Sequence, residues 1–181
     1  MLNSKEIYKK ATKLRENMYN ISPEDICREL NLVYFESEFK KQLGLLTCVS
    51  KNYFVIVNRE LNDVGKLFVT LHEAGHYIFH KELMGKAFTE KNYLKSTVQI
   101  EREANAFAAH FLISDKDVYD AAQNGFDYFQ LASEKNVFPE VAQIKLQEMR
   151  TLGHNVNICD CPDSKFLLRY EKAFENDEIW F

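Results

Sequence analysis

The strongest structural signal in this chain of 181 residues is a short pattern near its middle, His72-Glu73-Ala74-Gly75-His76. Residues four apart lie on one face of a helix, so both imidazoles can approach a single ion. At 100° per residue, Glu73 falls about 60° from His76 around the helix axis. The pattern therefore predicts a helix that carries two zinc ligands, His72 and His76, with Glu73 placed to act as a base on water.

The sequence around the pattern predicts a buried helix over residues 63–80. Its apolar positions surround most of the helix and comprise Leu67, Phe68, Leu71, Ala74, Ile78 and Phe79. Its polar stripe is limited to Lys66, Thr70 and Tyr77. A buried carboxylate beside two imidazoles costs several kcal/mol unless a cation compensates it. A metal site is therefore favoured over the alternative, a chance match on a structural helix.

A catalytic zinc site also needs a third protein ligand. The extended pattern with a third histidine is absent, because Phe79 stands where its glycine would fall. A second predicted helix, residues 98–113, offers two carboxylates. Glu103 shares the core-facing arc of that helix, whereas Glu101 points to a more mixed side. We expect Glu103 to be the ligand, with Glu101 as the alternative.

Two segments together resemble the ImmA/IrrE family of metallopeptidases. They are Phe68-Val-Thr-Leu-His-Glu-Ala-Gly-His-Tyr-Ile-Phe-His80 and Glu101-Arg-Glu-Ala-Asn-Ala-Phe-Ala-Ala109. The resemblance covers residues 22–152 in organisation and is sharp around these two segments. It implies a zincin-like fold, a zinc ion held by His72, His76 and Glu103, and cleavage of phage-type or stress-response repressors in the cytoplasm.

The sequence departs from the family pattern in two places. The second motif ends Phe111-Leu-Ile-Ser114 without the family's proline, at a position that we interpret as structural. Nothing after Leu152 resembles the sensor domain of larger members. The expected substrate is a helix-turn-helix repressor of a phage or mobile element. The alternative is a non-catalytic, metal-containing module that binds and sequesters such a partner.

Several further residues are candidates for supporting roles. His80 lies one turn beyond His76, where it either hydrogen-bonds a ligand or the catalytic carboxylate, or merely favours the helix C-terminus as a cation. Tyr77, Tyr93 and His110 are candidates to stabilise an oxyanion, each against an ordinary packing role. The strand-like segment 53–58 is a candidate to pair with an extended substrate.

The remaining pattern predicts an α+β domain, a small three-stranded sheet followed by a helical half. Domain 1–152 carries the motifs, and 153–181 forms an acidic, aromatic tail. The other predicted elements are helices 4–19, 126–135 and 139–152, a helix 23–30 capped by Ser22, a short helix capped by Ser114, strands 32–37, 45–50 and 53–58, and a polar loop over 81–96.

Composition limits the classes of partner. A formal charge of -4 disfavours direct binding to nucleic acid. No apolar stretch approaches the length of about eighteen residues that spans a membrane, and no secretory signal is visible. We therefore expect no membrane contact and a cytoplasmic location. Cys27 and Cys48 are predicted to be buried, and Cys159 with Cys161 lacks a second pair at zinc-finger spacing. Two imidazoles and a carboxylate also suit manganese or iron. The oligomeric state does not follow from the sequence.

Overall fold

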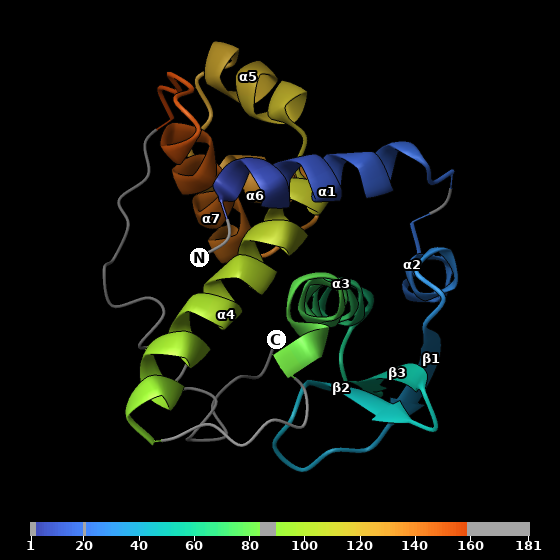
Figure 1. Ribbon diagram of the computed structural model, residues 1–181. Helices are drawn as coiled ribbons and strands as arrows, with labels where there is room; N and C mark the ends of the chain where they lie inside the picture. The colour runs from blue at the N-terminus through green and yellow to red at the C-terminus, as the bar shows by residue number, and fades with distance from the viewer. Residues whose placement is uncertain (1–2, 20, 84–89, 159–181) are drawn as a thin grey trace.

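The computed structural model describes residues 3–19, 21–83 and 90–158, without the side chains of Leu83 and residues 90–97. Within these ranges the chain is α+β, as predicted, with helices outnumbering strands (Figure 1). The elements are α1 (Ser4–Glu16), α2 (Pro23–Glu29), β1 (Val33–Ser37), β2 (Gly44–Val49), β3 (Asn52–Asn58), α3 (Asp63–His80), the 3-10 turn η1 (Lys81–Leu83), α4 (Glu90–Leu112), α5 (Asp115–Gln123), α6 (Tyr128–Lys135) and α7 (Pro139–Thr151).

Side-chain caps fix where several of these helices begin. The Ser22 hydroxyl accepts the Asp25 backbone N–H at 3.1 Å, ahead of a proline in the first turn of α2. Asn62 accepts the Gly65 N–H at 2.8 Å and starts α3. Ser114 forms a reciprocal capping box with the third residue of α5. These bonds satisfy amide groups that the first helical turn leaves without partners. The caps predicted at Ser22 and Ser114 are confirmed.

The three strands form one mixed sheet in the order β1-β3-β2. β1 runs parallel to β3, and β2 runs antiparallel to it. A tight turn joins β2 to β3 through Ser50 and Lys51, both with positive φ (50° and 68°). Because β3 is paired on both sides, it has no free edge. The expectation that segment 53–58 pairs with a substrate is therefore wrong.

Helix α3 lies between the sheet and α4, and it is the central element of the domain (Figure 1). The crossing of α3 and α4 is close: a Cβ added to Gly75 would lie 3.0 Å from the Ala104 Cα. Small residues at this point let the two backbones approach, which brings side chains of α4 to the His72–His76 face of α3. Thr70, predicted in a polar stripe, is instead fully buried and donates to the Lys66 carbonyl oxygen at 2.8 Å.

Some local expectations need correction. The predicted loop 81–96 is too long, because α4 already begins at Glu90. Cys27 is buried as expected, but Cys48 is exposed, since it lies near the turn end of the edge strand β2. Val156 and Ile158, placed in the predicted tail, belong to the buried core. The rest of that tail, with Cys159 and Cys161, lies outside the described residues.

The hydrophobic core joins the first helix to the second half of the chain. Its largest fully buried apolar side chains are Phe107, Phe111, Ile26, Leu71, Ile113, Leu131, Leu146 and Met149. These residues come from α2, α3, α4, α6 and α7 and from the turn that follows α4, so α3 and α4 are held by packing on several sides. Among the described residues, no helix is long and apolar enough to cross a membrane.

Candidate metal centre

Three side chains from α3 and α4 converge at the helix crossing. The Nε2 atoms of His72 and His76 lie 2.9 Å apart. The Glu101 carboxylate places one oxygen 3.1 Å from the His72 Nε2 and the other 3.5 Å from the His76 Nε2. The two imidazoles are mostly covered, at 17% and 16% exposed, whereas the Glu101 side chain is 49% exposed. The cluster therefore lies at the edge of the core, with a side open to solvent.

The spacing of these atoms fits a divalent metal ion. Tetrahedral coordination at zinc-to-nitrogen distances of 2.0–2.1 Å places neighbouring ligand atoms about 3.3 Å apart. The three observed separations of 2.9, 3.1 and 3.5 Å surround that value. Two imidazoles and one carboxylate are a common zinc ligand set and leave a coordination position open. Manganese and iron accept the same donors.

The orientation of His72 exposes the correct nitrogen to such an ion. Its Nδ1 lies 2.8 Å from the Asn105 side-chain oxygen, which can only accept a hydrogen bond. Nδ1 therefore carries the proton, and in the neutral ring Nε2 keeps its lone pair. That lone pair faces His76 and Glu101. Asn105 thus fixes the tautomer of His72 that a metal ion would require.

Glu73 lies on the sheet side of the same cluster. The backbone of Leu46 in β2 hydrogen-bonds its carboxylate. Gly44 of the same strand lies beside this carboxylate, and a Cβ added there would clash with a Val69 methyl and touch the Glu73 oxygen at 3.4 Å. Burial raises the pKa of Glu73, while the two histidines oppose that effect. The carboxylate is thereby held next to the three converging side chains.

The structure brings Glu101, rather than the expected Glu103, to the histidine pair. Glu103 does not reach His72 or His76 among its described contacts; its carboxylate lies 2.9 Å from the His80 Nε2. Glu101, the alternative, occupies the expected position. The physical reason is burial: Glu103 is only 5% exposed and points into the core, whereas an open metal site needs a ligand at the core's edge. Burial raises the pKa of Glu101, but the imidazoles of His72 and His76, in their protonated form, outweigh it and leave that pKa well below the usual range.

Comparison with known sequences assigns the chain to a family. The sequence model of the family described as Peptidase_M78, IrrE N-terminal-like domain, matches residues 27–147. That span includes α3, α4 and the whole sheet. The chain belongs to the IrrE N-terminal-like family of peptidases. The resemblance to ImmA/IrrE proteins drawn from the two motifs is confirmed.

Two curated proteins are similar to this chain over more than half of its length. The metallopeptidase ImmA of Bacillus subtilis (strain 168) is 27% identical over 137 residues, which cover 73% of this chain and 79% of that protein. An uncharacterized immunity region protein 2 of Bacillus phage phi105 is 29% identical over 109 residues, which cover 60% of this chain and 68% of that protein. Both alignments extend well beyond the two motif segments.

Tyr77 and His110 have their described contacts away from the histidine pair of this IrrE-like domain. Tyr77 packs edge-on against Tyr53, with ring centroids 4.9 Å apart, and Lys81 lies over its ring. His110 is two helical turns beyond Glu103 and belongs to a separate cluster. The side chain of Tyr93 lies outside the described residues. Nothing in these contacts places an oxyanion donor, so those roles remain predictions.

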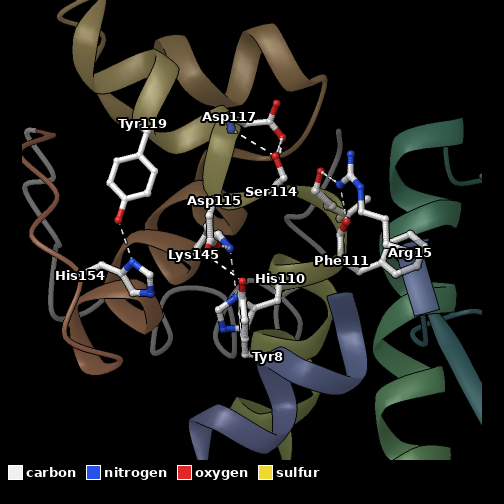
Figure 2. Close-up of polar contacts among 11 residues, drawn as sticks. Tyr8, Arg15, His110, Phe111, Ser114, Asp115, Asp117, Tyr119, Lys145 and His154 are labelled. Carbon is white, nitrogen blue, oxygen red and sulfur yellow. Dashed lines mark hydrogen bonds and ion pairs between the residues drawn. The ribbon is translucent and has the colours of Figure 1, made fainter. Parts of the chain in front are cut away.

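The separate cluster is a buried polar network that the sequence analysis did not foresee (Figure 2). The Lys145 ammonium donates to the His110 Nδ1 at 3.1 Å and to the Asp115 carboxylate at 2.6 Å. The Tyr8 hydroxyl donates to the other Asp115 oxygen at 2.9 Å. Lys145 shares the buried face of α7 with Val141, Ala142 and Met149. This helical spacing predicts burial, whereas the charge of a lysine suggests an exposed side chain. The network ties α1, α4, α5 and α7 together.

Proposed function

We propose that this chain is a metal-dependent endopeptidase whose metal ligands are His72, His76 and Glu101 and whose catalytic base is Glu73. The observation that carries the proposal is the convergence of three ligand atoms at the α3–α4 crossing, beside a carboxylate from the same helix. The family assignment supports the same reaction class. Zinc is the proposed ion.

The side chains divide the chemistry between them. A divalent ion held at this point would polarise a peptide carbonyl and make water more acidic. Glu73 would remove the proton of the attacking water and deliver it to the departing amine nitrogen. The Leu46 backbone keeps the carboxylate aimed at the reaction site. The partly exposed side of Glu101 leaves room for the substrate to approach.

The proposed substrate-binding surface is the outer edge of strand β2. Within the part of the chain that the structure describes, β2 has a sheet neighbour on one side only, and its backbone reaches Glu73. An extended peptide that pairs with this edge would pass directly beside the base. Hydrogen exchange tests this placement: a bound substrate peptide should slow exchange of the β2 amides, and unchanged exchange there would remove the hypothesis.

The proposed substrate is a helix-turn-helix repressor of a phage or mobile element, acting in the cytoplasm. The named relatives support this choice, since one is called an immunity region protein of a phage and the other a metallopeptidase. The net charge of -4 fits a chain that acts on the repressor rather than on its DNA.

Comparison of the wild type with Glu73→Gln tests the function. Zinc-loaded protein is incubated with the repressor encoded beside it, and fragments are mapped by mass spectrometry. The wild type should produce one pair of fragments, and Glu73→Gln should bind zinc equally but produce none. If both proteins release the repressor from its operator while it stays uncut, the chain is a sequestering module rather than a peptidase.

A further inference from the structure

A line of three side chains continues behind His76, away from the proposed metal ligands. His80 lies one helical turn beyond His76 and is 7% exposed. Its Nδ1 is 3.3 Å from the His76 Nδ1, and its Nε2 is 2.9 Å from a Glu103 oxygen. The other Glu103 oxygen accepts a hydrogen bond from the Gln99 side chain at 2.7 Å. The line therefore joins α3 to α4 through buried polar groups.

The hydrogen bonds in this line determine which nitrogens carry protons. An ionised carboxylate only accepts, so the His80 Nε2 must donate to Glu103. In a neutral His80 ring, Nδ1 then has the lone pair and accepts from the His76 Nδ1–H. His76 is left with a lone pair on Nε2, the atom that faces His72 and Glu101. Asn105 fixes the same tautomer of His72 by a single hydrogen bond.

We propose that His80 and Glu103 are positioning residues for His76, holding its ring in the orientation and tautomer that bind the metal. The inference rests on the metal site of the proposed function and adds two residues to it. Partners of this kind raise the basicity of a ligating imidazole and fix its direction, and their loss typically weakens metal affinity 10- to 100-fold. Glu103 thus acts through two histidines without touching the ion.

A purely structural link between α3 and α4 is the competing role for the same contacts. Such a link would affect unfolding but not the zinc dissociation constant of folded protein. The two roles therefore separate in metal affinity and in the visible absorption of cobalt-loaded protein, which reports the geometry of the ligands.

The experiment measures zinc affinity by competition with a chromophoric chelator at pH 7.5. His80→Phe and Glu103→Leu remove the two members of the line nearest to His76. Glu103→Gln is the conservative variant, because its amide oxygen can still accept from His80. His154→Phe is the matched control, since it makes the same change at a histidine that bonds Tyr119 instead. Circular dichroism of the metal-free proteins confirms that each variant is folded.

We expect the dissociation constant to rise 10- to 100-fold in His80→Phe and in Glu103→Leu, with an altered cobalt spectrum in each. Glu103→Gln should stay within about threefold of the wild type, and His154→Phe should equal it. The double variant should be no weaker than His80→Phe, because both changes break one line. If His80→Phe does not fold, Glu103→Leu against Glu103→Gln decides the question.

Unchanged zinc affinity and cobalt spectra in the folded removal variants would overturn the positioning role. Wild-type protein that binds zinc tightly and still leaves every repressor uncut would instead contradict the proposed function, without affecting this inference. A wild type that fails to bind zinc contradicts both.

Discussion

Acid should destabilise this protein through His110, a residue remote from the metal ligands. Burial, and then the ammonium of Lys145, lower the pKa of His110 from 6.5 to about 3. At a pH between these two values, His110 is protonated in the unfolded chain and neutral in the folded protein. Stability is therefore complete above pH 6.5 and falls as the pH drops toward 3. At pH 5 the loss from this residue is about 2 kcal/mol, at 1.36 kcal/mol for each pKa unit.

The groups that face His110 do not reverse this sign. Burial lowers the pKa of Lys145 in α7, and its hydrogen bond to Asp115 opposes that effect. Burial raises the pKa of Asp115, but the hydrogen bonds from Lys145 and Tyr8 outweigh it and bring that pKa below 3.8. Tyr8 stays neutral, since burial raises its pKa. His154 adds only a weak further repulsion. The expected slope thus belongs to His110.

Urea unfolding at pH 7.5 and pH 5.0 measures the effect. His110→Gln keeps an acceptor for Lys145 but cannot titrate, so its loss of stability between the two pH values should be smaller by about 2 kcal/mol. Comparing the two proteins cancels the titration of the histidines near α3. An identical pH dependence of stability in the wild type and in His110→Gln would show that His110 does not cause the loss of stability in acid.

Three more substitutions have outcomes that the packing determines. Gly75→Val should cost about 1–3 kcal/mol in urea unfolding and weaken zinc binding, because its Cβ meets the Ala104 backbone at 3.0 Å; unchanged zinc affinity would show that the helix spacing is not critical. Gly44→Val, whose Cβ would lie 2.4 Å from a Val69 methyl, should lower kcat of repressor cleavage by displacing Glu73; wild-type kcat would contradict this. Lys145→Met should lower the free energy of unfolding by about 2 kcal/mol, and an unaltered value would mean that Asp115 finds other partners.

Local sequence signals predicted the elements well and their assembly less well. Ser22 and Ser114 mark helix starts because capping is a short-range interaction between residues three apart. The strands were equally visible from their apolar runs. Their order was not, because β1 pairs in parallel with β3 although β2 lies between them in the sequence. The edge assigned to the substrate was wrong for that reason.

The ligand set shows the same limit on a smaller scale. His72, Glu73 and His76 follow from helical spacing within one element. The choice between Glu101 and Glu103 depended on which side of α4 meets α3, and the more buried side was chosen. The buried Glu103 contacts His80 instead, while Glu101 reaches His72 and His76 from the solvent edge. Asn105 was overlooked because a single amide carries no spacing signal.

Anomalous diffraction at the zinc edge, from crystals of the zinc-loaded protein, tests the metal centre most directly. The account predicts one strong peak within about 2.0–2.2 Å of the Nε2 atoms of His72 and His76 and of a Glu101 oxygen, with a position left for water. A peak bonded to Glu103, or no peak between the two histidines, would contradict it.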